Sequence, residues 1–338
     1  MIILASVLQV DFVNQEMVDL LKNIPDMTWT PGIPAIFAGK SEEEVFMMIG
    51  DTNINFQHDL EPDLLEKEAA METQELLEKA VLPDSFSWFD LKPECMRVRH
   101  ITLYNESTGI MKTCPAYWAF ASVGVFGDNR CILGRDPVRV NYSEQYRISC
   151  DNYAIDKIYS HCITGSNNYY HWFMTGNGLP TEACISYKGE YHNNYTKICP
   201  TECDDGSAIV TTTLGINKYY DGFLYKPNDI SKEDLMKQYM MKFGSLLGSF
   251  DVYYDYLFYQ NGIYQHKTGS LQYNQPVIIV GWGIENGVKY WLCRQNWGEL
   301  WGESGDQDPE NYDQLGYFRI LRGVNHCNIE ETCYIYEV

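Results

Sequence analysis

The sequence predicts an α+β protein in which helices come early and β-strands follow. Apolar residues fall at helical spacing among glutamates over about 60–80, and another helix is expected to start just after Pro115 and continue through 123–131. Runs of β-branched and aromatic residues cut by glycine lie at 277–283, 290–298 and 316–323. Such runs are typical of successive antiparallel strands, so the chain is expected to have a helical part and a sheet part.

Composition and charge exclude several classes of protein. The chain has 338 residues, of which 45 % are hydrophobic and 14 % aromatic, which is more buriable surface than a disordered or collagen-like chain carries. A net charge of −21 repels phosphate, so neither nucleic acid nor an anionic membrane surface is an expected partner. No apolar run reaches the roughly 18 residues that crossing a bilayer requires.

The first 82 residues differ in character from the rest, and we refer to them as the leader. Over 1–80 the chain has 16 acidic residues against four lysines, a net of −12, and no cysteine. We therefore predict a pro-region over 16–82 and a disulfide-bonded domain over 83–338. The apolar block 1–10 predicts a signal peptide over 1–15, or alternatively a buried first strand or helix.

Eleven cysteines, all after residue 94, indicate an oxidising compartment. Three N-x-S/T sequons, at Asn105, Asn141 and Asn194, point the same way and are candidate glycosylation sites. A zinc site is the rival explanation for clustered cysteines. It is disfavoured because Cys199 and Cys203 have no second pair of ligand spacing nearby, so no metal and no cofactor are expected.

Several short strings occur in a fixed order along the chain. They are W-T-P-G-I-P at 29–34, L-P-D-S-F-S-W at 82–88, C-P-A-Y-W-A-F-A-S at 114–122, Y-S-E-Q at 142–145, Y-Q-H-K-T-G at 264–269, V-G-W-G at 280–283 and R-G-V-N-H-C at 322–327. Together they resemble the papain family of cysteine peptidases, and within it the cathepsin B branch, from about residue 82 to the end. The resemblance implies a helical N-terminal lobe and an antiparallel, barrel-like C-terminal lobe with a cleft between them.

The resemblance also implies where catalytic residues should stand, and all four positions differ here. Aligning on Trp118 puts the nucleophilic cysteine at Tyr117 and the oxyanion glutamine at Met111, while aligning on 280–283 puts the histidine at Gln275. The orienting asparagine falls on Gln295. Tyrosine has an ordinary pKa of about 10 and glutamine does not titrate, so neither can replace the thiolate or the histidine. Methionine donates no hydrogen bond, so it cannot replace the oxyanion glutamine. Cysteine-peptidase catalysis at these positions is therefore not expected.

The scaffold and part of the cleft are expected to remain. The resemblance implies the disulfides Cys95–Cys131, Cys114–Cys162, Cys150–Cys199 and Cys184–Cys203. It places Gly165, Trp297 and Trp118 along the peptide cleft, although a packed core tryptophan is an equal alternative for Trp297. Cys293 is expected to be a buried thiol, and Cys327 and Cys333 are left to pair or stay reduced.

Two departures from the family concern loops. The stretch between Cys184 and Cys203 is too short for the histidine-bearing occluding loop of typical cathepsin B, so dipeptide trimming is not expected. An acidic insertion over 306–316 interrupts the strand lobe and is expected to be a solvated loop.

Three functional hypotheses follow. The first is a monomeric pseudopeptidase of the secretory pathway, the lysosome or vacuole, or the extracellular space that binds peptides, protease inhibitors or active relatives. The second is an active cysteine endopeptidase using a relocated thiol, with Cys114 or Cys327, beside His326, as candidates. The third is a structural glycoprotein with no ligand.

Overall fold

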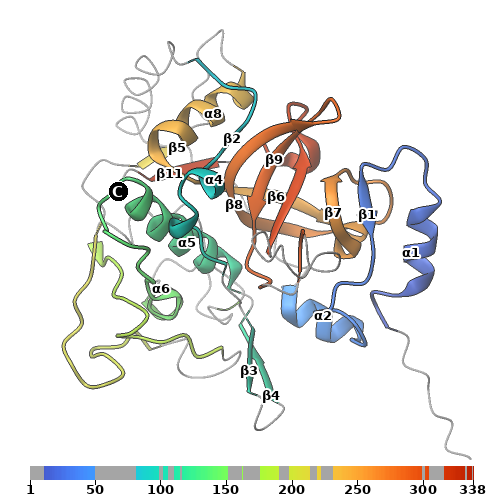
Figure 1. Ribbon diagram of the computed structural model, residues 1–338. Coiled ribbons are helices and arrows are strands. Elements are labelled where there is room, and N and C mark those ends of the chain that lie inside the picture. The colour runs from blue at the N-terminus through green and yellow to red at the C-terminus, as the bar shows by residue number, and fades with distance from the viewer. Residues whose placement is uncertain are drawn as a thin grey trace, which may run out of the picture.

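The structure is a computed structural model in which a mixed β-sheet stands beside a helical part (Figure 1). It describes residues 11–49, 81–98, 102–105, 110–114, 116–150, 162, 176–189, 198–213, 219–221, 231–298, 301–303, 316–331, 333–336 and 338. Residues 1–10 of the predicted signal peptide over 1–15, the predicted helix over about 60–80, Gly165, Asn194 and most of the acidic insertion lie outside the described residues.

The sheet contains nine described strands. Their order is β1-β7-β10-β9-β8-β6-β11-β5, with β2 pairing β8. The bounds are β1 Trp29–Pro31, β2 Phe86–Ser87, β5 Tyr219–Asp221, β6 Leu246–Tyr253, β7 Tyr259–Tyr264, β8 Leu271–Glu285, β9 Val288–Arg294, β10 Tyr317–Leu321 and β11 Cys333–Tyr336. The described pairs are antiparallel except β10 with β7, which run parallel, so the prediction of antiparallel strands is confirmed with one exception. The exception arises from the order of the strands in the sheet. After β6, the chain passes through η3 Tyr254–Phe258 into β7, which lies on the side of β10 opposite to β9 and β8.

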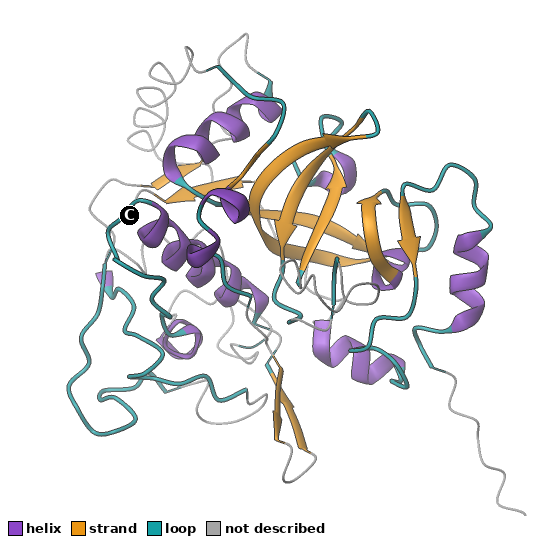
Figure 2. Ribbon diagram, in the orientation of Figure 1, coloured by secondary structure: helices purple, strands orange, loops and turns teal. Residues whose placement is uncertain are grey.

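The helical part is organised around one buried helix, α5, which spans Tyr117–Ile132 (Figure 2). Every residue of α5 except Arg130 is buried, and α6 Glu144–Cys150, the 3₁₀ turn η1 Pro93–Cys95 and the strand β8 contact this helix. The other described elements include α4 Trp88–Leu91, α8 Lys232–Phe243, the 3₁₀ turn η5 His326–Asn328, and the hairpin β3 Thr102–Asn105 with β4 Ile110–Thr113. The expected helix after Pro115 is confirmed.

A buried ion-pair cluster joins the helical part to the sheet. Asp128 of α5 accepts from Arg294 Nη2, at the end of β9, at 2.7 Å and from Arg139 Nε at 2.8 Å. The carboxylate of Asp128 is fully buried and Arg294 is 1 % exposed. Removing one member of such a pair leaves an uncompensated buried charge, so the cluster sets how α5 sits against β9.

The leader is built into the sheet and its core. Asn14 caps α1 Gln15–Lys22 by accepting from the Met17 amide, and α2 is Glu42–Ile49. The strand β1 pairs with β7. Gly262 of β7 has φ +96°, and a Cβ there would lie 2.5 Å from the Thr28 carbonyl oxygen, so only glycine fits at this position. Nine leader side chains belong to the main hydrophobic core: Val13, Val18, Leu21, Trp29, Ile36, Phe37, Val45, Met48 and Ile49. The leader is therefore part of the folded unit.

Four disulfides fasten the domain. They join Cys95 to Cys131, Cys114 to Cys162, Cys150 to Cys199 and Cys184 to Cys203, which are the pairs that the resemblance implies. Cys293, Cys327 and Cys333 are thiols, and Cys293 is buried as expected. Within the described residues, no helix combines the length and the apolar character needed to cross a bilayer.

The ion-pair cluster gives a test of how the two parts are joined. The substitution Arg294→Met should lower the free energy of unfolding by about 3 kcal/mol, because the Asp128 carboxylate loses one of its two buried partners. Urea unfolding followed by circular dichroism measures the loss. The control Lys289→Met removes an ion pair to Glu233 from a side chain that is 51 % exposed, and should cost less than about 1 kcal/mol. If both variants lose the same free energy of unfolding, the buried cluster contributes no more to stability than an exposed ion pair does.

Candidate functional site

Three of the four positions that the resemblance assigns to catalysis converge in the interior. Tyr117 is the first residue of α5, Gln275 lies in β8 and Gln295 follows β9 directly. Because Ile278 of β8 pairs with Arg294 of β9, and α5 packs on β8, the three side chains come from adjoining elements. Tyr117 is 2 % exposed and both glutamines are fully buried. Met111 lies in β4 opposite Tyr104 of β3, and its side chain is outside what the structure describes.

Each of the two glutamines accepts a hydrogen bond from a tyrosine. The Tyr273 hydroxyl donates to Gln275 Oε1 at 2.8 Å, and the Tyr256 hydroxyl donates to Gln295 Oε1 at 3.2 Å. The Tyr117 and Tyr273 rings lie 6.1 Å apart. Burial raises the pKa of Tyr256 and of Tyr273 well above the ordinary value, so both hydroxyls stay neutral and keep donating. The sequence did not identify these tyrosines, since only the fold brings them to the glutamines.

The amide nitrogens of this cluster are left as donors. Gln275 Nε2, Gln295 Nε2 and Asn296 Nδ2 are buried and have no hydrogen-bond partner among the described residues. Neutral amides and neutral phenols can donate and accept hydrogen bonds, but none of them exchanges a proton near neutral pH. The described side chains of the cluster can therefore bind an acceptor, but they offer neither a thiolate nor an imidazole.

The leader packs on a tryptophan beside this cluster. The Phe37 ring of the leader meets the Trp297 ring edge-on at 5.3 Å, and Phe37 is fully buried. Trp297, expected along the cleft, is 2 % exposed, and Trp118 is fully buried with the Arg147 guanidinium 5.0 Å from its ring. Both tryptophans are thus packed in the core while the leader is in place.

The thiols proposed as replacements are not activated. Cys114 is in a disulfide with Cys162. Burial, with a contribution from Asp255, raises the pKa of Cys327 to about 12, so the thiolate is scarce at neutral pH. The neighbouring His326 accepts at Nε2 from the His266 amide at 2.9 Å, and burial lowers the pKa of His326. This imidazole holds the backbone of the 264–269 segment in place.

Asp255, which the sequence did not single out, organises that same segment. Its carboxylate is fully buried and accepts from the Tyr264 hydroxyl at 2.6 Å, and it lies 3.0 Å from His266 Nδ1. The amides of Lys267 and Thr268 donate to its second oxygen at 2.7 and 3.1 Å. His266 is therefore held in a structural network.

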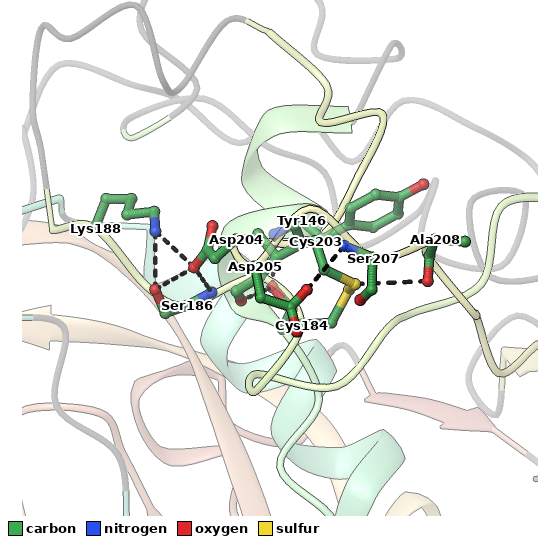
Figure 3. The surroundings of a disulfide bond; sticks show 11 residues. Tyr146, Cys184, Ser186, Lys188, Cys203, Asp204, Asp205, Ser207 and Ala208 are labelled. Atoms are coloured by element: carbon green, nitrogen blue, oxygen red, sulfur yellow. Dashed lines mark hydrogen bonds and ion pairs between the residues drawn. A yellow bond between two sulfur atoms is a disulfide. The ribbon is translucent and has the colours of Figure 1, made fainter.

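The short loop closed by Cys184 and Cys203 is held by a carboxylate, as Figure 3 shows. Asp204 accepts from the Ser186 hydroxyl at 2.6 Å and from Lys188 Nζ at 2.7 Å. Partial burial alone would raise the pKa of Asp204, but the hydrogen bonds from Lys188 and Ser186 outweigh it and lower that pKa to about 2. Cys203 Sγ contacts the Ala208 carbonyl at 3.6 Å.

The fold and the three converging positions define a two-part cysteine-peptidase scaffold. A family model described as papain family cysteine protease matches residues 83–336, and the chain belongs to that family. It is 31 % identical over 307 residues to "Cathepsin B-like CP2" of Giardia intestinalis, covering 90 % of this chain and 88 % of the relative. It is 28 % identical over 264 residues to "Cathepsin B-like cysteine proteinase 3" of Caenorhabditis elegans, covering 74 % of this chain and 64 % of that protein.

Solved structures show the same fold. "ProCathepsin B S9 from Trypanosoma congolense" superposes with a TM-score of 0.74 at 21 % identity, covering 97 % of this chain and 99 % of that one. The digestive procathepsin L 3 of Tenebrio molitor superposes with a TM-score of 0.63 at 19 % identity, covering 96 % of this chain and 87 % of that one. The likeness to these precursor structures includes the part of the chain ahead of residue 83, so the fold is that of a papain-type protein with a propeptide.

The Asp204 hydrogen bonds predict a dependence of stability on pH. The folded pKa of about 2 lies below the ordinary 3.8, so the contribution of Asp204 is complete above pH ~4 and is lost as pH falls towards 2. The Asp204 side chain is 38 % exposed, which limits the effect to about 1 kcal/mol or less. Unfolding of Asp204→Asn and of the unsubstituted chain should differ at pH 6 and converge near pH 2. Asp84→Asn, at an exposed carboxylate, is the matched control and should show no such convergence.

The tyrosine–glutamine pairs give a second test. Tyr273→Phe should lower the free energy of unfolding by about 1–3 kcal/mol, because Gln275 Oε1 would be left buried without its donor. Tyr253→Phe is the control, since the Tyr253 hydroxyl makes no hydrogen bond to the described residues. Thermal unfolding of both variants measures the effect. If Tyr273→Phe is as stable as the unsubstituted chain, the Tyr273–Gln275 hydrogen bond contributes nothing to stability.

Proposed function

We propose that this chain is a non-catalytic, cathepsin B-like binding protein. The observation that carries the proposal is the set of residues at the convergence of α5, β8 and β9. There Tyr117, Gln275 and Gln295 are buried at the positions that the resemblance assigns to catalysis, and each glutamine accepts a hydrogen bond from a tyrosine. Papain-type hydrolysis requires a thiolate that attacks and an imidazole that exchanges its proton.

The energetics of the cluster support the proposal. Neither glutamine titrates, and burial raises the pKa of Tyr256 and Tyr273 rather than lowering it towards neutrality. A general base needs an ionisable group poised near the working pH, and the described side chains of this cluster provide none. The cluster instead resembles a protein core, in which buried polar groups are uncharged, although its amide nitrogens keep no partner among the described residues.

The alternative is an active cysteine endopeptidase with a relocated thiol. It is disfavoured because Cys114 is in a disulfide and the pKa of Cys327 is raised to about 12. Cys293 is fully buried, and burial raises the pKa of its thiol well above the ordinary value. Cys333 lies in β11 at 1 % exposure. A peptide could reach Cys293 or Cys333 only by local unfolding of the core, whereas Cys327 is half-buried and is disfavoured by its raised pKa.

The expected setting and ligands follow from the scaffold. Four disulfides and cathepsin-like relatives favour the secretory pathway or a lysosome-like compartment. Peptides, protease inhibitors or active relatives are the partners that a peptidase scaffold would bind. Since Phe37 packs on Trp297, a ligand of the cleft must displace the leader or bind elsewhere.

Intact-mass analysis with a thiol-directed inhibitor tests the proposal. The full chain is incubated with an activated peptide epoxide before and after limited digestion in trans by an active cathepsin-type peptidase, and its mass is read under native conditions. We expect no added inhibitor mass, and alkylation of the thiols of Cys293, Cys327 and Cys333 only after denaturation. A single native adduct would contradict the proposal, and its position would identify the working nucleophile.

A gain-of-function variant provides the control for accessibility. The combined substitution Tyr117→Cys, Gln275→His, Gln295→Asn and Met111→Gln restores the residue types that the family uses at these positions. If the digested variant takes up the epoxide and the digested parent does not, the four residues account for the difference. Uptake by the parent alone would point to a thiol outside this cluster.

A further inference from the structure

A second candidate site lies away from the buried cluster, between the start of the 83–338 domain and the hairpin formed by β8 and β9. A cavity of about 640 Å³ is lined on one side by residues 85–87, 90 and 91 and on the other by Trp282, Glu285 and Tyr290. Figure 1 shows β2 and α4, which carry the first side, against β8. None of the lining residues belongs to the leader segment 11–49, so this pocket, which we call the hairpin pocket, is open while the leader covers the cleft.

The floor of the hairpin pocket is apolar and aromatic. Trp282 and Leu292 are 2 % and 8 % exposed, and Phe86 stacks on Trp282 with ring centroids 4.9 Å apart. Tyr290 presents a half-buried ring beside them. The Trp282 and Tyr290 rings already carry Phe86 and Arg319, so the apolar surface open to an alkyl stem is that of Leu91, which is 59 % exposed, and the half-buried Phe86.

The rim of the hairpin pocket is acidic. Asp90 is exposed, and no described residue forms an ion pair with it. Glu285, on the other side, is 50 % exposed and pairs with Arg319 at 2.7 Å. Arg319 is the pocket's one described cation, and it also donates to the buried Glu303 at 2.6 Å. Its charge is therefore already matched by two carboxylates.

These charges determine whether the pocket favours a positively or a negatively charged ligand. With Arg319 neutralised by Glu303 and Glu285, the free charge at the rim is the carboxylate of Asp90, on a chain whose net charge is −21. An anionic ligand would meet repulsion and no free donor cation. A cation with an apolar stem would satisfy both the rim and the floor.

A second cavity indicates that the ligand is extended. About 490 Å³ is lined by residues 27–30 of the leader and by Asn261, Asn286 and Val288, and it shares Glu285 and Arg319 with the hairpin pocket. Both cavities are thus lined by the Glu285–Arg319 ion pair. A segment whose side chain enters the hairpin pocket would continue past this ion pair into the second cavity.

From this arrangement we infer that the hairpin pocket receives a lysine or arginine side chain from an extended segment of a partner protein. The alkyl stem lies along Leu91 and Phe86, and the charged end lies between Asp90 and Glu285. The flanking residues of the partner follow the track past Arg319. The inference does not depend on whether the buried cluster is catalytic, since the two sites share no residue.

Calorimetry on the full chain tests the inference with defined probes. Acetyl-Gly-Gly-Arg-Gly-Gly-amide is compared with its Gln and Glu counterparts at about 0.15 M salt, where charges farther away than ~8 Å are largely screened. We expect the Arg peptide to bind at least about tenfold more tightly than the Gln peptide, as expected for a charge-assisted hydrogen bond, and the Glu peptide not to bind. Equal binding of the Arg and Gln peptides, no binding of the Arg peptide, or preference for the Glu peptide would overturn the inference.

Matched variants separate the pocket from the overall charge. Asp90→Asn with Glu285→Gln should weaken binding of the Arg peptide at least about tenfold, and Ser85→Trp, which fills the mouth without changing charge, should weaken it similarly. Glu202→Gln with Asp205→Asn removes the same two charges from an exposed loop and should leave binding unchanged. Equal weakening in this control would mean that the peptide responds only to net charge. Circular dichroism of each variant confirms that the comparison is made on folded protein.

Discussion

The buried carboxylate of Asp128 is the constraint on which the arrangement of the molecule depends. It is the one charged group of the fully buried face of α5, and its partners Arg294 and Arg139 come from the end of β9 and from the segment after α5. Desolvating a carboxylate is so costly that both partners must be in place for the fold to be stable. The helix that carries Tyr117 and the strand that leads into Gln295 are thereby set against each other, which determines the geometry of the whole cluster.

On the proposed function, the cluster has the chemistry of a core rather than of an active centre. In an active cysteine peptidase, the thiolate and the protonated imidazole are charged groups inside the protein. Keeping them charged there lowers the stability of the fold. Here tyrosine hydroxyls satisfy the glutamine oxygens, and the Phe37 ring of the leader closes the outer side against Trp297. The exchange of ionisable groups for neutral ones would therefore stabilise the fold while ending the chemistry, in keeping with the proposed function.

Local strings predicted the fold well, but contacts between distant segments were beyond them. The helix after Pro115, the strands at 277–283 and 316–323 and the burial of Cys293 follow from periodicity and glycine punctuation. Tyr273 and Gln275 lie two residues apart and their side chains are on the same face of β8. The sequence did not predict the hydrogen bond between them, because residues at this spacing seldom bond to each other through their side chains. The Asp128–Arg294 pair joins residues 166 apart, and the parallel contact of β7 with β10 arises only once the sheet is assembled.

The leader strand has a consequence for what proteolysis could achieve. The leader contains no cysteine, so after a cut between residues 49 and 81 only non-covalent contacts would hold β1 on β7 and Phe37 on Trp297. The product of such a cut would be a two-fragment complex whose dissociation depends on dilution. Cleavage and release of the leader would then be separate events. The first depends on a protease, and the second depends on the affinity of the cut leader for the rest of the chain.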